Sequence, residues 1–164
     1  MDLVALEKAL TSRIGGIRPE RIVFVGVGNR LRGDDAIGPA VIDAIKGSVP
    51  HAIDAGVAPE NYTGMIKRLR PLAIIFIDAL DFGGAPGSMA LVESGEIRRY
   101  GASTHGLSLE VAMDYLRQET GADVLLIGVQ PERICEEEGL SLSIVKPING
   151  LAAMLIKAIR DFSA

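Results

Sequence analysis

The sequence of 164 residues is short of cysteine, histidine and basic charge. It has one cysteine, Cys135, which excludes an internal disulfide and a metal site built from cysteines alone. The net charge of −4 lacks the basic excess that phosphate backbones require, so we expect no nucleic-acid partner. There is no basic amphipathic stretch, and no apolar run approaches the roughly 18 residues of a membrane span. We therefore expect no membrane insertion.

The N-terminal segment does not have the composition of a signal peptide. Residues 1–8 are acidic and amphipathic, with no basic start and no apolar centre. We therefore expect a cytoplasmic protein, and the length and mild acidity favour a monomer. The length suits a single domain over residues 1–164 with a substantial core, in which residues 1–20 form an N-terminal helical extension.

Buried-strand patterns alternate with helical patterns along the chain. Strands are expected at 21–27, 49–55, 72–78, 88–93 and 123–129, and helices at 2–14, 36–46, 61–69, 107–118 and from Ile148 to Phe162. This alternation predicts an α/β fold, a three-layer α/β/α sandwich around a mostly parallel, roughly five-stranded sheet. The short connection before 88–93 predicts an antiparallel strand there. In the helix at 107–118 we expect Leu107, Val111, Tyr115 and Leu116 to face inward.

The loop after the first expected strand is rich in glycine and carries two adjacent carboxylates. It runs from Gly26 to Gly38 as Gly-Val-Gly-Asn-Arg-Leu-Arg-Gly-Asp-Asp-Ala-Ile-Gly. Phosphate-binding loops avoid carboxylates at this place, because the partial positive charge of the helix N-terminus is what attracts the anion. A loop that puts Asp34 and Asp35 there suits a cation or a proton transfer.

A dinucleotide site is the competing interpretation of this loop. Gly26-x-Gly28 follows a strand, and Asp54 lies at about the right distance downstream to contact a ribose. The third glycine is misplaced, however, since Leu31 stands where the motif needs it, and two aspartates would face the pyrophosphate. A dinucleotide-binding α/β protein is therefore the less favoured alternative.

Acidic and amide side chains follow several of the expected strands. They are Asp34 and Asp35, Asp54, Asp78 and Asp81, and Gln130 and Glu132. Because ligands bind beyond the carboxyl ends of parallel strands, these groups are expected to gather at one edge of the sheet. Like charges in a cleft raise each other's pKa, and a bound metal removes that cost. The pattern thus indicates a metal site.

The nitrogen ligand for such a site must come from one of two histidines. His51 lies inside the second expected strand, where a packing or solvent-facing role is the ordinary one. His105 lies in a loop of small residues before a helix, close to the acidic edge.

The two carboxylates come from the strand ends. Asp35 could cap the following helix, and Asp34 is the better cap if the helix begins earlier, so one of the pair is spare. Asp81 is expected to cap a turn. Asp78 ends an apolar strand, where a carboxylate needs a partner. Asp35, Asp78 and His105 therefore form a candidate metal site with two oxygens and one nitrogen. Three protein ligands leave positions open for water or substrate, and the donor set suits zinc, nickel or iron.

No serine or cysteine nucleophile is evident. Ser103 and Ser108 flank His105 but lie in no Gly-x-Ser-x-Gly elbow, and the carboxylates beside Cys135 disfavour its thiolate. This favours hydrolysis assisted by a metal.

The sequence resembles the nickel-dependent endopeptidases that mature the large subunits of [NiFe]-hydrogenases. The segments that carry the resemblance are Gly26–Gly38, Asp54–Asn61, Ile77–Gly83, Ser103–Leu107 and Gly128–Glu132. The resemblance implies a twisted five-stranded sheet and metal ligands at Asp35, Asp78 and His105. It covers about residues 22–155, and the segment Asp54–Asn61 is most similar to the branch that serves formate-hydrogenlyase and archaeal hydrogenases.

The resemblance also implies an activity and a partner. Such an enzyme removes the C-terminal peptide of the [NiFe]-hydrogenase large-subunit precursor once nickel, supplied by the precursor, is in place. The expected catalytic and metal residues are Asp35, Asp78 and His105, with Asp34 or Asp81 orienting a ligand and Asn29 and the amides of 26–28 stabilising an oxyanion. The alternative is a non-catalytic nickel checkpoint or assembly chaperone that holds the precursor tail.

Overall fold

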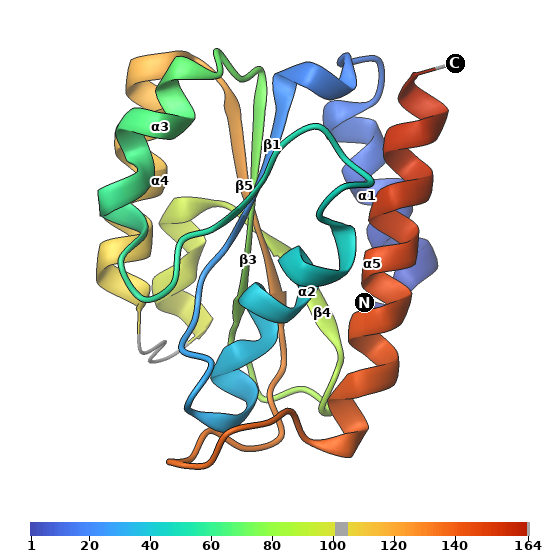
Figure 1. Cartoon of the computed structure of the whole chain (residues 1–164), viewed down its shortest axis with the longest axis vertical. Coiled ribbons are helices and arrows are strands. Elements are labelled where there is room, and N and C mark those ends of the chain that lie inside the picture. Colours follow the sequence, from blue (N-terminus) through green and yellow to red (C-terminus); the bar gives the residue numbers. More distant parts are fainter. Residues whose placement is uncertain (101–104, 164) are drawn as a thin grey trace.

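A five-stranded sheet forms the centre of the molecule, as a computed structural model that describes residues 1–100 and 105–163 shows (Figure 1). The strands are β1 (Ile22–Gly26), β2 (Ala52–Asp54), β3 (Ala73–Ala79), β4 (Met89–Val92) and β5 (Asp123–Val129). Their order is β2-β1-β3-β5-β4, and all neighbours are parallel except β4, which is antiparallel to β5. The expected α/β fold with a mostly parallel sheet is confirmed.

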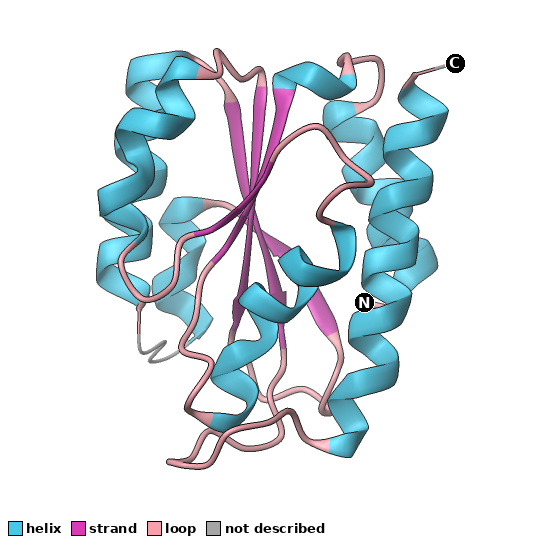
Figure 2. Cartoon of the chain, in the orientation of Figure 1, coloured by secondary structure: helices cyan, strands magenta, loops and turns pink. Residues whose placement is uncertain are grey.

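Helices cover both faces of the sheet (Figure 2). They are α1 (Leu3–Ile14), α2 (Ile37–Ile45), α3 (Thr63–Arg68), α4 (Gly106–Thr120) and α5 (Leu142–Phe162). α1, α2 and α5 pack in one core cluster and α3 and α4 in the other. Short 3-10 turns occur at Pro19–Arg21, at Gly33–Ala36 (η2), at Pro59–Tyr62 and at Ser94–Tyr100.

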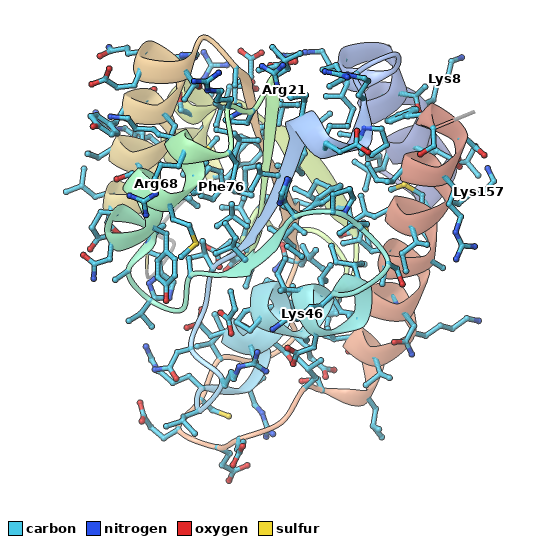
Figure 3. The ribbon with its side chains drawn as sticks, turned by 45° about the horizontal axis from the view of Figure 1, so that its top comes forward. Lys8, Arg21, Lys46, Arg68, Phe76 and Lys157 are labelled. Carbon is cyan, nitrogen blue, oxygen red and sulfur yellow. The ribbon has the colours of Figure 1, made fainter. Side chains whose placement is uncertain are left out.

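The strands are apolar on both faces because both faces are covered. Every residue of β1 and β3 is buried, and neighbouring side chains on a strand point to opposite layers. Phe24 packs in the cluster of α1, α2 and α5, whereas Phe76 packs in that of α3 and α4. Figure 3 shows Phe76 inside the molecule and the charged side chains of Lys8 and Lys157 on its outside.

The N-terminal helix α1 packs on the domain beside β4 and α5. Its buried residues are Leu6, Leu10 and Ile14, at the helical spacing seen in the sequence. The ammonium group of Met1 donates to the carbonyl of Met89 at 2.7 Å, and Arg13 pairs with Asp123 at 2.7 Å. These contacts tie both ends of α1 to the strands at that edge.

The expected inward face of α4 is wrong for three of its four residues. Leu107, Val111 and Tyr115 are 70%, 56% and 40% exposed, and only Leu116 is buried as expected. The helix instead buries Leu109, Ala112, Met113 and Leu116. Leu107, Val111 and Tyr115 form one apolar stripe on this helix, and the four buried residues form another. Only the second stripe packs in the core.

The closing helix α5 begins earlier than expected. It starts at Leu142 rather than Ile148 and contains Pro147. Ile144 and Ile148 lie one turn apart and are both buried in the core, so the helix packs on the sheet layer on each side of the proline. By length and composition alone α5 is also apolar enough to cross a membrane, and 44% of its apolar 18-residue stretch is buried inside the protein. A buried core helix meets the same criterion, and α5 contributes Leu151 and Leu155 to the core.

The second strand is shorter than expected, because only Ala52–Asp54 joins the ladder and Val49 makes an isolated bridge with Lys46. His51 therefore lies just before β2 rather than within it. Its carbonyl accepts the amide of Phe24 at 3.0 Å.

The start of α2 lies unusually close to the strand ends. A Cβ built on Gly38 would meet the backbone nitrogen of Val27 at 2.6 Å and would also overlap the carbonyl oxygens of Val27 and Ile77. Only a glycine allows this approach, which brings η2 and its aspartates against the ends of β1 and β3.

We expect Gly38→Ala to lower the free energy of unfolding by about 1–3 kcal/mol, because the new methyl group meets backbone that cannot yield. The control is Gly64→Ala on α3, where the nearest atom lies 4.0 Å from the new Cβ. It should leave stability unchanged or raise it by up to about 1 kcal/mol through helix propensity. Urea unfolding measures both, and a Gly38→Ala protein as stable as wild type would contradict the close packing.

Candidate active site

The carboxyl ends of β1, β2, β3 and β5 lie at one edge of the sheet, since these strands are parallel. This edge carries the acidic residues that the sequence placed there, but they have different partners. Asp54 pairs with Arg30 at 2.8 Å. Asp81 is exposed and accepts hydrogen bonds from the Gln130 side chain at 3.0 Å and from the Gly83 amide at 3.2 Å. The turn-capping expectation for Asp81 is confirmed.

Asp35 and His105 are in direct contact. Nε2 of His105 lies 3.1 Å from Oδ2 of Asp35, and both side chains are nearly buried, at 9% and 2% exposed. The same carboxylate oxygen accepts the amide of Asn29 at 3.1 Å. His105 stands at the N-terminus of α4, where its carbonyl accepts the amide of Leu109. The loop after β1 and the start of α4 thus meet at these two side chains.

Asp78 is the third buried group at this edge, at the end of β3. It is 1% exposed, and neither of its carboxylate oxygens has a hydrogen-bond partner among the described residues. Burial, and then the nearby charge of Asp35, raise the pKa of Asp78 well above the ordinary aspartate value. The turn η2, which carries Asp35, packs against β3.

The three side chains match the donor set of a transition-metal site. An unpaired buried carboxylate is costly in a folded protein, and coordination of a cation by Asp78 would remove that cost. As they stand, however, no three His, Cys, Asp or Glu side chains of the described part of the chain are grouped closely enough to hold a metal ion. The assignment of Asp35, Asp78 and His105 as ligands therefore remains a prediction.

Asp34 does not cap α2 as the sequence suggested. Its side chain is fully buried and accepts the amides of Glu132, Arg133 and Ser141, together with the Ser141 hydroxyl. Within residues 1–100 and 105–163, no side-chain hydrogen bond caps the N-terminus of α2. Neither sequence motif nor spacing signals the role of Asp34, because the donors lie about a hundred positions along the chain.

The oxyanion donors expected in the loop after β1 are already engaged. The amide of Val27 donates to Ile77 and that of Gly28 to Gly56, each at 2.9 Å, and the Asn29 amide donates to Asp35. The expectation is therefore wrong for the amides of Val27 and Gly28. Gly28 itself has a φ of 151°, and a Cβ there would overlap the carbonyl of Asp35.

The Ser108 hydroxyl near His105 is engaged with the main chain rather than with the imidazole. It donates to the backbone carbonyl of His105 at 3.3 Å, which is not the geometry of an activated nucleophile. Ser103 lies outside the described residues.

We expect Asp78→Asn to stabilise the metal-free protein increasingly as pH rises. Below the unfolded pKa of about 3.9, the carboxyl group is protonated in both states and the folded state bears no charge penalty. Above it the unfolded chain ionises first, so stability is lost until the folded group also ionises. The melting temperature of Asp78→Asn relative to wild type, measured in chelator, should therefore rise by several degrees between pH 4.5 and pH 8.

Asp81→Asn is the control of opposite sign. The Gln130 side chain and the Gly83 amide lower the pKa of Asp81, so its contribution to stability is present above the unfolded pKa and is lost as pH falls. Its melting temperature relative to wild type should fall with rising pH. A difference for Asp78→Asn that does not change with pH would show that Asp78 titrates normally.

Comparison with known proteins places this chain in one family. The profile of the hydrogenase maturation protease family matches residues 39–159. The hydrogenase 3 maturation protease of Escherichia coli K12 is 35% identical over 115 residues, which cover 67% of this chain and 72% of that protein.

Solved structures give the same result. The crystal structure of the [NiFe] hydrogenase maturation protease HycI from Thermococcus kodakarensis matches with a TM-score of 0.83 and 33% identity, over 93% of this chain and 99% of that one. The hydrogenase maturating endopeptidase HybD from Escherichia coli matches with a TM-score of 0.71 and 28% identity, over 86% and 93%. On the extent of the profile match and the similarity of these relatives, this chain belongs to the hydrogenase maturation protease family.

Proposed function

We propose that this protein is an endopeptidase that removes the C-terminal extension of a [NiFe]-hydrogenase large-subunit precursor after nickel insertion. Membership of the maturation protease family supports the reaction class, and the names of the relatives support the hydrogenase substrate. The observation that carries the proposal is the buried carboxylate of Asp78, which has no hydrogen-bond partner among the described residues and whose pKa the charge of Asp35 helps to raise. Asp35 in turn contacts His105.

In this proposal nickel is part of the substrate, and Asp35, Asp78 and His105 recognise it. A precursor without nickel offers these groups no cation, so the buried oxygens of Asp78 gain no partner and the substrate is not held. Asp35, Asp78 and His105 would hold nickel brought by the precursor, and the cation would give the unpaired oxygens of Asp78 a partner, with any proton on that carboxyl released to solvent. Discrimination between loaded and empty precursor then follows from the cost of leaving this carboxylate charged and unpaired.

The hydrolytic step would be assisted by the same metal. A bound metal ion polarises a carbonyl or activates water, which supplies a nucleophile without a serine or cysteine. The protein's own groups hold the candidate ligands: the Asn29 amide donates to Asp35, and His105, at the N-terminus of α4, contacts the same carboxylate oxygen. The donation of the Ser108 hydroxyl to a carbonyl agrees with a mechanism in which serine is not the nucleophile.

We expect His105→Ala and Asp35→Asn each to slow precursor processing by at least about 100-fold, since even residues that only support metal ligands contribute 10–100-fold. The assay incubates each variant with nickel-loaded and nickel-free precursor and records intact masses. Wild type should remove a defined peptide only from the loaded precursor. The control is His51→Ala, because His51 lies outside the site and its loss should leave processing unchanged.

The outcomes test the ligand assignment and distinguish an endopeptidase from a protein that only binds the precursor. Processing by a folded His105→Ala protein at the wild-type rate would refute the ligand assignment. A stable complex of wild type with the loaded precursor, without any mass change, would favour the nickel checkpoint or holding chaperone. Sizing of the wild-type protein during the same experiment tests the expected monomer.

A further inference from the structure

Two adjacent aspartates in η2 have separate tasks. We propose that Asp34 is a positioning residue, which fastens the loop between β5 and α5 (residues 131–141) to η2 and thereby fixes the carboxylate of Asp35. The proposal rests on the proposed function of Asp35, but it concerns a residue that makes no use of the metal itself. Asp34 then holds two loops of the protein together, whereas Asp35 recognises the metal of the substrate.

The side chain of Asp34 uses both carboxylate oxygens on this loop. Oδ2 accepts the amides of Glu132 at 2.9 Å and Arg133 at 2.8 Å, and the hydroxyl of Ser141 at 2.9 Å. Oδ1 accepts the amide of Ser141 at 2.7 Å. The four donors come from both ends of the loop, so one carboxylate holds the two ends together.

The backbone of η2 reinforces the same contact. The amide of Gly33 donates to the carbonyl of Glu137 at 2.7 Å, and the amide of Asp34 donates to the carbonyl of Arg133 at 2.9 Å. Gly33 has a φ of 58°, and a Cβ there would meet the Arg133 carbonyl at 2.8 Å. The turn and the loop therefore touch through main chain as well as through the side chain.

Asp35 is the next residue and is held from the other side. Its Oδ2 accepts the amide of Asn29 and contacts His105 Nε2, both at 3.1 Å. The backbone of η2 is thus fixed by the loop after β5, while the Asp35 side chain is fixed by the loop after β1. Releasing the first constraint lets η2 shift and alters where Asp35 directs its oxygens.

The four hydrogen bonds to Asp34 require a charged carboxylate at this position. All four donors are neutral N–H or O–H groups, which bind a carboxylate more strongly than a neutral oxygen. Asparagine at this position keeps one acceptor oxygen but turns an NH₂ donor toward amide donors, leaving buried N–H groups unsatisfied. Asp34→Asn therefore changes the side-chain volume little but disrupts the hydrogen bonds between η2 and the loop after β5.

A spectroscopic experiment without precursor tests the positioning directly. The backbone amide of Asn29 reports on Asp35, so its ¹⁵N–¹H resonance should move in Asp34→Asn in the direction that it moves in Asp35→Asn. Ser141→Ala, which removes one donor of four, should give a smaller shift in the same direction. Shifts confined to Glu132, Arg133 and Ser141, with Asn29 unmoved in both variants, would show that Asp34 serves the loop alone.

The processing rate at saturating nickel-loaded precursor supplies the functional readout. Asp34→Asn should lower this rate at least tenfold, and Ser141→Ala by two- to threefold. The control is Leu10→Ala on α1, a buried residue outside the site that lowers stability without touching η2. It should process at the wild-type rate at a temperature where all variants are folded.

The outcomes separate this proposal from the proposed function. If wild type leaves the precursor uncut, the proposed function fails, and the Asn29 resonance still decides the positioning role. If wild type cuts and Asp34→Asn cuts equally fast, the positioning role is refuted and the function stands. Should Asp34→Asn fail to fold, Ser141→Ala decides by the same two measurements, and its having neither effect overturns the proposal.

Discussion

The arrangement of this protein depends on the burial of a carboxylate without a partner at the end of its central strand. Among the described residues no group reaches the Asp78 carboxylate with hydrogen-bond geometry, the neighbouring Ala79 amide lowers its pKa less than burial raises it, and Asp35 adds a second negative group. Such a group destabilises the folded state at neutral pH, and the remainder of the fold must offset it. Two covered sheet faces, with fully buried β1 and β3, provide that stability.

Close packing at two glycines brings the loop after β1 to the same strand ends. Gly38 lets α2 approach the strand ends, and Gly28 lets the loop backbone pass against Asp35. His105 is brought to the same point from α4, on the opposite face of the sheet from α2. A site assembled from three separate segments at a strand edge is held by the scaffold rather than by one flexible loop.

Neighbouring aspartates illustrate how environment, rather than residue type, sets the role of a carboxylate. Asp34 has four neutral donors and serves the connection between η2 and the loop after β5. Asp35 has one amide and a histidine, whereas the described residues offer Asp78 neither. The number of hydrogen-bond partners thus falls from Asp34 through Asp35 to Asp78. Asp78, the carboxylate with the fewest partners, is the one on which a cation in the substrate would act.

Local and topological signals in the amino-acid sequence were enough to predict the layers, the strands and the edge at which the acidic residues lie. Continuous apolar runs mark strands that are covered on both faces, and the strand-end rule places the groups that follow them. The same signals single out Asp35, Asp78 and His105, and the contact of Asp35 with His105 agrees with that choice.

Long-range packing, in contrast, selects which stripe of α4 is buried, where α5 begins, and what Asp34 binds. Each of these depends on partners far away in sequence. The helix α4 carries two apolar stripes of which the sheet covers one, and Ile144 finds its place in the core across Pro147. The donors to Asp34 lie 98 to 107 positions away, so only the folded chain brings them to its carboxylate.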